Sequence, residues 1–591
     1  MFKKFINLKK IFGNKDYFSL ISVLVLSVLS GFLELIGIGL IGVFAISVSD
    51  PGIVIEKIPI PELKLFLYEL EKIKLIILFS ISIIIVFLLK HFLSFFISFL
   101  EIKISKKILL NIKKKIFTFF LNQNYEYFLN NNKSHLINLV SGQSQSFMGY
   151  IFQVFSIIKE LIVILLIFFG MIYINWKIIL FITLILTLLT FIFGKFFKKK
   201  LNDIGNKSRI LEKVETQYLN EAYQGIKFIK LGSKENFFIN LISKVVKEKN
   251  KYEVYHYLIG KLPKIFLEMI ILIIFTSVVI LLIDISQNDQ TIFGVITFLA
   301  FSSVRLLPSF VTINNAYTNL SFFRSPFEII YSMMMSLKEY EEDGAKIIFK
   351  ENIKKISFKN VNFKYVSSDY DVLHNINFEV NENDFLGVIG TSGSGKSTIL
   401  HLLSGLIEPT KGSIILNDYD RNNINEFNLN NKISYIPQDS FILDSTLENN
   451  IAFADQEHEI NQKKISECLS FTNLVDFVEN LPKKTKSLLG DNGSKISHGQ
   501  RQRIGLARAI YNDPNVIILD ESLNALDYDN EKEILSNIRK LKNKILIFVS
   551  HRLESLKLCN KLIILSNGTI KDFGEKELVL SRNKDLNKYF S

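Results

Sequence analysis

Cysteine is almost missing from this chain of 591 residues, which holds only Cys468 and Cys559. The two lie far apart, with neither a paired spacing nor the spacing of metal ligands, which argues against a disulfide framework and a cysteine metal site. We expect both to be reduced thiols. Proline is also scarce, and none occurs between Pro61 and Pro263. Long helices can therefore run through this stretch without interruption.

The sequence also lacks a continuous basic stripe, although its formal net charge is +13. Its lysine clusters flank apolar runs, a placement that suits anionic lipid headgroups better than nucleic acid. Nearly half of the residues are apolar, and these are concentrated before about residue 330. A chain of this length is expected to form two or more domains. The asymmetry predicts a membrane part followed by a soluble part.

Six apolar stretches are long enough to cross a bilayer, which takes about 20 helical residues. They lie near residues 17–47, 74–100, 147–173, 176–197, 263–284 and 291–320. The lysine-rich N-terminus resembles the opening of a secretory signal peptide. The apolar run that follows it is about thirty residues long and has no obvious cleavage site, so we expect a retained first span.

Lysine and arginine crowd the N-terminus and residues 103–115 and 196–200, whereas the connection 284–291 has neither. This bias predicts a multi-pass membrane protein with both chain ends in the cytoplasm. The polar segments after the second and fourth spans keep a helix-compatible composition, so the helices should extend beyond the bilayer. Their hairpin tips, near residues 122–133 and 221–235, could touch a cytoplasmic domain.

Residues 325–350 change from apolar to charged, which marks a linker. Beyond the linker, short apolar runs alternate with helical patterns, as in an α/β domain with buried strands. The runs lie at residues 356–365, 385–389, 433–436, 516–519, 545–549 and 562–565.

A glycine-rich loop follows the predicted strand 385–389 and precedes an amphipathic helical pattern. It reads Gly390-Thr391-Ser392-Gly393-Ser394-Gly395-Lys396-Ser397-Thr398 and matches the phosphate-binding loop in pattern and context. The glycines let backbone amides converge on phosphate oxygens, and the helix N-terminus adds positive potential. Lys396 would reach the β and γ phosphates and Ser397 would hold Mg²⁺. The predicted cofactors are ATP and Mg²⁺.

Two adjacent carboxylates follow the apolar strand 516–519. Burying an acid there is costly without a cation, so Asp520 is expected to orient Mg²⁺ or its water. Glu521 would polarise the attacking water in an in-line phosphoryl transfer. The alternative is a solvated strand end.

Between these two sites lies Lys495-Ile496-Ser497-His498-Gly499-Gln500-Arg501, and with it the whole chain resembles the ATP-binding cassette (ABC) family. The resemblance adds four nucleotide-site residues: Tyr365, which stacks on adenine; Gln438 of the Q-loop, also near the metal; Asp527 of the D-loop; and His551, the switch histidine that completes a catalytic set with Lys396 and Glu521. It also implies that two cassettes sandwich two ATP molecules, so Ser497, Gly499 and Gln500 would contact nucleotide on another subunit of a homodimer.

Taken singly, these assignments leave alternatives open: Tyr365 could be a packed strand residue, Gln438 a surface amide and His551 a helix cap. The sequence also departs from the family pattern. His498 stands where glycine is usual and could crowd the partner's ATP or add a phosphate contact. Asp491 replaces a glutamate and shortens its reach toward the partner's coupling segment. Both identical sites should still hydrolyse ATP.

The resemblance implies a multi-domain fold: an all-α, six-helix polytopic transmembrane domain over residues 1–338, then an α/β P-loop NTPase domain, the ABC cassette, over residues 339–591. One chain carrying both resembles an exporter-type half-transporter, an ATPase coupled to transmembrane movement. ATP binding would close the cassettes and open the path outward. Several membrane passages, including Phe32-Leu33-Glu34 and Arg305-Leu306-Leu307-Pro308, resemble PglK-type flippases of lipid-linked oligosaccharides.

The cargo implied is an amphiphile with a pyrophosphate and a glycan headgroup. Lys90, Lys264 and Arg305 lie inside or near predicted spans, where a charge is costly unless it meets water or a partner, and an anionic headgroup would supply one. Alternatively, the lysines snorkel to an interface or Lys264 pairs with Glu268. Other cargoes remain open, namely lipid A-type lipid, drug or peptide. A different class of function is an ATP-gated channel or regulator, which two intact hydrolytic sites argue against.

Overall fold

The computed structural model describes residues 9, 11–49, 51–56, 61–285, 291–340, 349–366, 368–424, 429, 432–456, 458–524, 526–550 and 552–583. The chain forms two compact units. The helical unit consists of Met1–Gln123 and Asn131–Glu342, and the α/β unit consists of Asn124–Asn130 and Asp343–Ser591.

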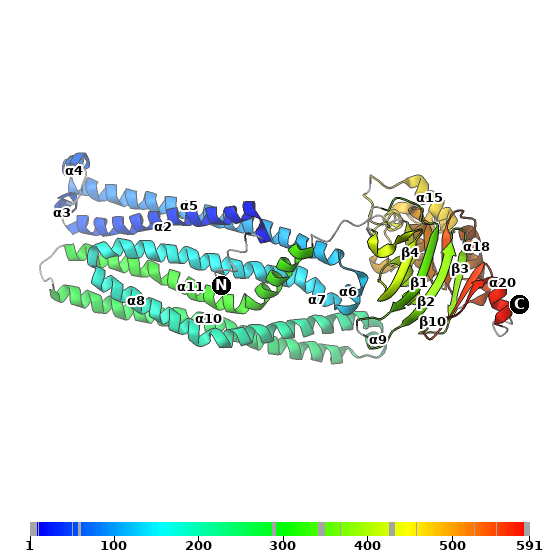
Figure 1. The fold of residues 1–591 in the computed structure, drawn as a ribbon. Coiled ribbons are helices and arrows are strands. Elements are labelled where there is room, and N and C mark those ends of the chain that lie inside the picture. The colour runs from blue at the N-terminus through cyan, green and yellow to red at the C-terminus, as the bar shows by residue number, and fades with distance from the viewer. Residues whose placement is uncertain are drawn as a thin grey trace. The chain divides into compact units, whose positions relative to one another are not determined.

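Long helices build the helical unit (Figure 1): α2 (Asn14–Ser49), α5 (Lys72–Leu121), α8 (Ser144–Gln224), α10 (Glu235–Ile285) and α11 (Thr291–Tyr340). Shorter helices join them: α3 (Pro51–Glu56), α4 (Pro61–Tyr68), α7 (Lys133–Asn138), the π-helix η1 (Leu139–Gln143) and α9 (Ile226–Leu231). The helix α11 runs through Pro308 and Pro326 into the predicted linker. This stretch is helical because its apolar side chains, such as Phe327, pack against α8.

The helix α8 is assigned without a break over 81 residues, although the sequence predicts two spans there. In one straight helix, Gly149 and Gly205 would lie roughly 84 Å apart. Yet Gly149 lies against Phe323 and Gly205 lies against the neighbouring Phe322. The chain therefore reverses direction between the two glycines, and α8 consists of two arms (Figure 1).

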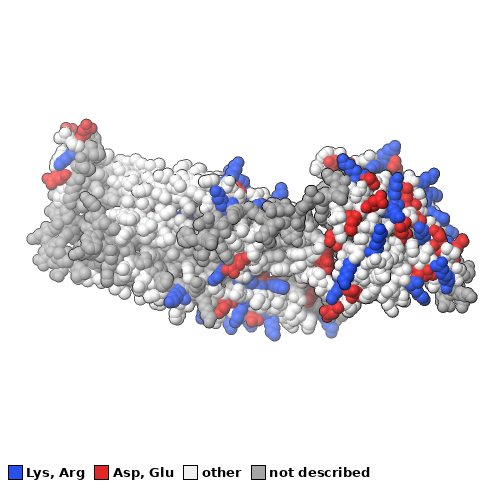
Figure 2. Space-filling model, in the orientation of Figure 1, with Lys and Arg blue, Asp and Glu red and all other residues white. Residues whose placement is uncertain are grey.

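Three helical segments among the described residues are long and apolar enough to cross a membrane: Asn14–Val48, Lys72–Leu121 and Lys133–Gly170. They overlap the first three predicted spans. The other three fall on the later part of α8 and on α10 and α11, where many side chains lie outside the described residues. On the helical unit, Figure 2 shows a band of described surface without Lys, Arg, Asp or Glu between charged side chains at both ends. Such a band is typical of a surface that faces lipid.

Two sheets form the centre of the α/β unit. The larger has the order β10-β9-β3-β8-β7-β6, with parallel neighbours from β9 to β6 and an antiparallel β10; the smaller is antiparallel, in the order β2-β1-β4-β5. The strands are β1 (Lys355–Phe363), β2 (Leu373–Asn381), β3 (Phe385–Gly390), β4 (Lys411–Leu416), β5 (Tyr419–Asp420), β6 (Ile433–Ile436), β7 (Val516–Asp520), β8 (Ile545–Val549), β9 (Lys561–Ser566) and β10 (Thr569–Glu575).

Every apolar run predicted as a strand is a strand: β1, β3, β6, β7, β8 and β9. The helices of this unit are α6 (Tyr125–Asn130), α12 (Lys396–Ser404), α14 (Leu447–Ile451), α15 (Gln462–Phe471), α16 (Val475–Glu479), α17 (His498–Tyr511), α18 (Tyr528–Arg539), α19 (Leu553–Leu556) and α20 (Lys576–Arg582), with 3₁₀ turns η2 (Arg421–Asn423), η3 (Lys484–Lys486) and η4 (Asp491–Gly493).

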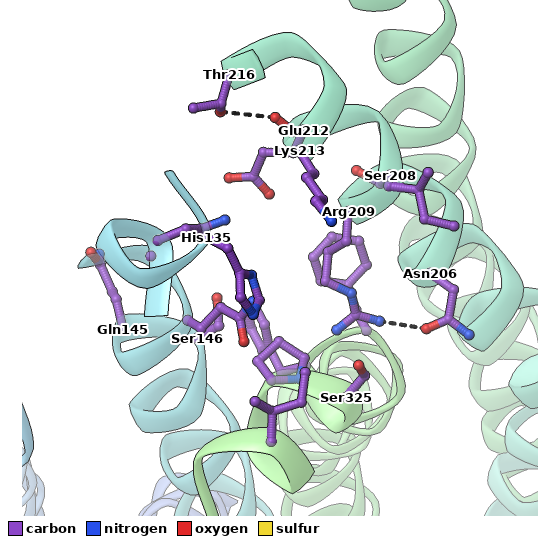
Figure 3. Close-up of a pocket in the computed structure, with 18 of the residues that line it drawn as sticks. His135, Gln145, Ser146, Asn206, Ser208, Arg209, Glu212, Lys213, Thr216 and Ser325 are labelled. Carbon is purple, nitrogen blue, oxygen red and sulfur yellow. Dashed lines mark hydrogen bonds between the residues drawn. The ribbon is translucent and has the colours of Figure 1, made fainter. Parts of the chain in front are cut away.

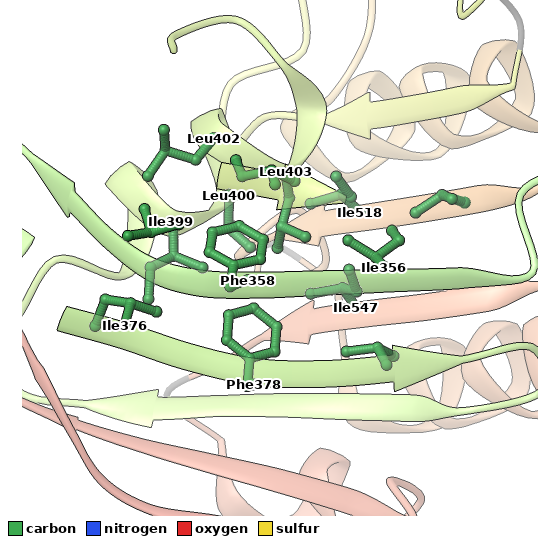
Figure 4. Close-up of a cluster of buried hydrophobic side chains, with 14 of the residues drawn as sticks. Ile356, Phe358, Ile376, Phe378, Ile399, Leu400, Leu402, Leu403, Ile518 and Ile547 are labelled. Atoms are coloured by element: carbon green, nitrogen blue, oxygen red, sulfur yellow. The ribbon is translucent and has the colours of Figure 1, made fainter. Parts of the chain in front are cut away.

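The main core of this unit joins α12 to both sheets (Figure 4). Ile399, Leu400 and Leu402 of α12 are fully buried. Below them, the rings of Phe358 and Phe378 stack between β1 and β2 with their centroids 4.5 Å apart. Each buried aliphatic side chain contributes about 1.5–3 kcal/mol. The first turn of α12, which begins at Lys396, is therefore firmly placed at the end of β3.

Candidate functional site

The predicted phosphate-binding loop joins the carboxyl end of β3 to α12. Gly393 and Gly395 have φ angles of 79° and 98°, a region that favours glycine. The Lys396 ammonium group donates hydrogen bonds to the carbonyl oxygens of Gly390 and Thr391, at 3.0 Å each. Lys396 is only 8% exposed, so the loop contains a buried cation whose hydrogen-bond partners given above are uncharged backbone carbonyl groups.

The other polar groups of the loop also suit an anionic ligand. The hydroxyl oxygen of Ser394 is buried and has no hydrogen-bond partner, which is unusual for a buried polar atom. Thr391, Ser392 and Ser397 are exposed at the start of α12, where backbone amides carry partial positive charge. The residues present therefore fit a nucleoside triphosphate and its metal ion.

The strand β7 runs parallel to β6 and β8 and ends at Asp520, on the same sheet edge as the loop. Tyr435 of β6 donates a hydrogen bond of 2.7 Å from its hydroxyl to Asp520 Oδ2. His401 Nε2 lies 3.4 Å from the same hydroxyl. Burial raises the pKa of Asp520, the hydrogen bond from Tyr435 opposes this rise, and burial lowers the pKa of His401.

Sequence reasoning missed Tyr435 and His401. The available signal was a polar ring at the end of the apolar strand β6 and an imidazole inside the amphipathic helix α12. Neither signal identifies a partner, because the contact forms only when β6 pairs with β7.

Glu521 directly follows Asp520 and has a φ of 50°, a sparsely populated conformation for a residue other than glycine. Its backbone N–H donates to the carbonyl oxygen of Val549 in β8. Its carboxylate accepts a hydrogen bond of 3.3 Å from Asn524 Nδ2. The strained backbone turns the Glu521 side chain away from the direction that β7 would give it. Such outliers gather at functional sites.

Tyr365 and Thr398 lie close together beside the loop, because the hydroxyl of Tyr365 is 3.3 Å from Thr398 Oγ1. The Tyr365 ring is half-buried and packs edge-on against Phe363. This arrangement places an aromatic ring beside the phosphate-binding loop.

Ser497 caps the N-terminus of α17. Its hydroxyl oxygen accepts from the Gln500 N–H at 3.2 Å, while Gln500 Oε1 accepts from the Ser497 N–H at 2.8 Å. His498 Nε2 lies 3.2 Å from Asp439 Oδ1, an arrangement that neither sequence alternative for His498 included. Ser497 and His498 are exposed and Gly499 is partly exposed, so the start of α17 is accessible.

Two other predicted nucleotide residues, Gln438 and Asp527, form local contacts with residues outside the phosphate-binding loop. The Gln438 side chain is exposed, and its backbone carbonyl accepts from Gln502 Nε2 at 3.2 Å. Asp527 caps α18 by accepting from the Asn530 backbone N–H at 3.3 Å, and it also accepts from the Asn530 side-chain amide at 2.7 Å. His551 lies outside the described residues.

Known families match both units of the chain. The family described as "ABC transporter" matches residues 373–524, which include the phosphate-binding loop and both carboxylates. The family described as "ABC transporter transmembrane region" matches residues 20–308. Together the two cover about three quarters of the sequence. The chain belongs to the ABC transporter family.

A transmembrane region fused to one ATP-binding domain makes this transporter an exporter-type half-transporter of the inner membrane. It binds ATP and couples ATP hydrolysis to transport. The prediction of an α-helical membrane domain followed by an α/β cassette is thus confirmed.

Curated relatives of the transporter include a lipid flippase and a protein-translocation ATP-binding protein. The ATP-dependent lipid A-core flippase of Cupriavidus pinatubonensis is 25% identical over 452 residues, 76% of each chain. The alpha-hemolysin translocation ATP-binding protein HlyB of Escherichia coli O157:H7 is 32% identical over 250 residues, 42% of this chain and 35% of HlyB. A solved structure, that of a bacterial Atm1-family ABC exporter with ATP bound, matches 98% of the transporter and 97% of its own chain with a TM-score of 0.79. At 17% identity, this last match concerns the fold alone.

In the membrane helices, two of the predicted substrate residues meet at one carboxylate. Glu34 is 4% exposed; the Lys90 ammonium lies 3.2 Å from its Oε1, and Arg305 pairs with the same oxygen. Arg305 also donates to the Ser309 hydroxyl at 3.0 Å, which donates to Glu160 at 2.6 Å. Two cations and two carboxylates therefore compensate one another inside the predicted spans.

Lys264, the third predicted substrate residue, is not part of this cluster. Its ammonium lies 3.6 Å from Glu268 Oε1, one turn along α10, and both side chains are about half exposed. The structure matches the pairing that the sequence left open for Lys264.

The first predicted hairpin tip belongs to the α/β unit through α6. The Tyr125 ring packs edge-on against His401 with centroids 5.7 Å apart, and Glu126 Oε1 accepts from the Val366 N–H at 3.1 Å. Because His401 also contacts Tyr435, a continuous row of side chains leads from α6 to Asp520. The second predicted tip carries α9, which lies in the helical unit.

Proposed function

We propose that this exporter works as a homodimer that flips a lipid-linked oligosaccharide outward across the inner membrane, with both chain ends in the cytoplasm. The proposal keeps the predicted division into a transmembrane domain, 1–338, and a nucleotide-binding domain, 339–591. The cargo is an amphiphile that carries phosphate and glycan on a lipid tail.

One observation carries the cargo class. The alignment with the lipid A-core flippase extends over 452 residues, more than the whole α/β unit contains. It must therefore include a large part of the helical unit, the half that contacts cargo in any transporter of this architecture. A likeness confined to the ATP-binding unit would carry no information about cargo.

The roles proposed for single residues rest on the motif pattern and, for those that lie at the loop, on their positions beside it. Lys396 and the residues from Gly390 to Thr398 bind the phosphates, and Tyr365 stacks on the adenine ring. Glu521 polarises the attacking water, and His551, which lies outside the described residues, keeps its predicted role as the switch histidine. A bound Mg²⁺ would neutralise phosphate charge, and the residues proposed to hold it are Ser397, Gln438 and Asp520.

The accessible start of α17 supports the proposed homodimer. Ser497, Gly499 and Gln500 lie at an exposed helix N-terminus, where amides and a hydroxyl can meet the phosphates bound by a second chain. Asp527 stands at the start of α18 in the same role, at the junction of the two copies. This arrangement gives two equivalent sites.

A panel of cargoes tests the proposal. The purified transporter in lipid nanodiscs is assayed for ATPase stimulation by a polyprenyl-pyrophosphate oligosaccharide, lipid A core and apolar peptides. We expect the lipid-linked oligosaccharide to stimulate turnover several-fold at the lowest concentration. Preferential stimulation by lipid A core, the cargo in the name of the aligned relative, or by peptides would replace the proposed cargo.

A further inference from the structure

A cavity of about 1020 Å³ lies inside the helical unit, and its lining residues are different from those of the charge cluster at Glu34. Three walls enclose it (Figure 3). The first is made by α7, η1 and the first arm of α8, the second by residues 206–217 of the second arm, and the third by residues 322–329 of α11. Each wall lies at or just beyond the end of a predicted span. The third wall belongs to the C-terminal half of α11.

The walls are polar in an unusual way, because they are rich in amides and hydroxyls and poor in acids. The amide side chains are Asn132, Asn138, Gln143, Gln145, Gln153, Asn206 and Gln217, and the hydroxyls are Ser134, Ser146, Ser208, Thr216 and Ser325. Amides and hydroxyls both donate and accept hydrogen bonds, as the hydroxyl groups of a sugar do. Phe152, Phe322 and Phe323 add flat apolar faces against which a sugar ring can pack.

Two buried polar atoms on the walls have no hydrogen-bond partner. Gln143 Oε1 is one, and Arg209 Nη1 is the other. The other terminal nitrogen of Arg209 donates to Asn206 Oδ1 at 2.7 Å, so the guanidinium is held in place while one side of it stays unused. Buried groups of this kind call for a partner. In Figure 3, Arg209 and His135 point into the space between the walls.

The wall that carries Gln143 has an irregular backbone. Residues Leu139–Gln143 form the π-helix η1, a rare element that is frequent at functional sites. Gly142 lies there, and a side chain at Gly142 would meet Asn138 Oδ1 at 2.5 Å. The wider turn of the π-helix interrupts the regular α-helix, and it places the unpaired Gln143 Oε1 on the cavity wall.

The charge of the cavity is positive on one wall. Arg209 and Lys213 lie one turn apart on the second arm of α8, so they share a helix face, and Glu212 is the acid beside them. Arg305 and Lys90 differ in this respect, because Glu34 already compensates them. The wall with Arg209 is therefore a more favourable site for an anionic group than Lys90 and Arg305 are.

We propose that this cavity is the loading site for the headgroup of the cargo, with the glycan hydroxyls on the amide wall at Gln143 and a phosphate of the lipid linkage on Arg209 and Lys213. This rests on the proposed function, which sets the cargo class. It replaces Lys90 and Arg305 as first contacts and gives them a structural role in the spans.

The test measures the concentration of lipid-linked oligosaccharide that half-maximally stimulates ATPase activity in nanodiscs, for wild type, Gln143→Leu, Arg209→Gln and Arg324→Gln. Arg324 is the matched control, since it lies on α11 outside the cavity and forms an exposed pair with Glu328. We expect this concentration to rise about fivefold for Gln143→Leu and about tenfold or more for Arg209→Gln, with no change for Arg324→Gln.

A second readout separates binding from folding. Removing an unsatisfied buried oxygen should not destabilise a protein, so Gln143→Leu is expected to melt at or above the wild-type temperature while its response to cargo weakens. Unchanged half-maximal concentrations in Gln143→Leu and Arg209→Gln, with normal wild-type stimulation, would overturn the loading site alone. A wild type that does not respond to the lipid-linked oligosaccharide would overturn the proposed function, and the headgroup assignment with it.

Two further ligands distinguish the source of recognition. The free oligosaccharide should compete with the lipid-linked form in the wild type and compete less well in Gln143→Leu. For polyprenyl pyrophosphate without glycan, the half-maximal concentration should rise in Arg209→Gln and stay unchanged in Gln143→Leu. If both variants raised the half-maximal concentration of this glycan-free lipid equally, the amide wall would not bind the glycan and the proposal would fail.

Discussion

The two carboxylates at the end of β7 are held in different ways. Asp520 is buried and receives the Tyr435 hydroxyl, which opposes the rise in its pKa caused by burial. Glu521 sits one residue later on a backbone with a φ of 50°, with Asn524 on its carboxylate. We expect Asp520 to serve the metal ion and Glu521 to act on water.

Glu521→Gln tests this division. The amide keeps the shape of the side chain but cannot take up a proton, so steady-state ATP hydrolysis should fall at least about a hundredfold. ATP binding should stay within about twofold of wild type. Glu533→Gln, at an exposed position on α18, is the control and should hydrolyse ATP normally. Substantial residual turnover in Glu521→Gln would remove Glu521 from catalysis.

Both cysteines are buried thiols, as reduced cytosolic residues can be. Burial raises the pKa of Cys468 to about 11 and that of Cys559 to about 12. At pH 8 only about one Cys468 in a thousand is a thiolate, the form that reacts. We expect iodoacetamide to modify neither thiol in the native protein and both after unfolding in guanidinium, as mass spectrometry of the peptides would measure. Fast native labelling at pH 8 would show that the thiols are accessible.

At this scale, sequence reasoning succeeds where local spacing determines the contact. The loop around Lys396 and the pair Asp520 and Glu521 are continuous motifs attached to strands. Tyr435 and His401 could not be predicted in the same way, because residues distant in the chain meet only after β6 pairs with β7. The sequence likewise suggested an anionic headgroup as the partner of Lys90 and Arg305, and it could not show that both pair with Glu34, which lies far away in the chain.

Among the helices, the Glu34 cluster joins α2, α5, α8 and α11 through buried charges. Glu34→Gln would leave Lys90 and Arg305 without their shared carboxylate. Breaking a buried ion pair lowers the free energy of unfolding by about 3–5 kcal/mol, so the melting temperature of Glu34→Gln should drop by several degrees. Glu268→Gln removes an exposed pair with Lys264 and should cost about 1 kcal/mol or less. Equal melting of the two variants would contradict a structural role for the cluster.

The short helix α6 connects a membrane hairpin to the row of side chains that ends at Asp520. Tyr125→Ala removes the ring that packs on His401, so we expect the ratio of cargo-stimulated to basal ATPase activity to fall several-fold. Leu129→Ala, on an exposed position of the same helix, should keep the wild-type ratio. Equal ratios in both variants would show that Tyr125 does not transmit the cargo signal.

Elements with uniform apolar content were predictable, and those without it were not. The strands β3, β7 and β8 are buried on both faces and read as continuous apolar runs. The strand β2 mixes Asn and His with apolar residues, and β10 is a polar edge strand, so neither stands out. The reversal inside α8 was visible as two spans in the sequence, although the structure assigns the whole of it as helix.

For the whole molecule, the proposed dimer explains why the start of α17 is exposed although it does not belong to the sheet edge that carries the phosphate-binding loop. Lys396, Asp520 and Glu521 gather at the carboxyl ends of β3 and β7. Ser497 caps a helix that is accessible to a second chain. The account therefore predicts that each nucleotide needs Lys396 from one copy and Ser497 from the other.

Mixed dimers test this claim most directly. Chains that carry Lys396→Ala and chains that carry Ser497→Arg, both with Glu521→Gln to prevent turnover, are given different tags, and the mixed dimer is isolated through both. If the two copies share each site, one site of the mixed dimer is doubly defective and the other is intact. We predict that radiolabelled ATP stays trapped at about half the amount held by a Glu521→Gln dimer, whereas neither defective homodimer retains any. Mixed dimers that retain no ATP would contradict the account.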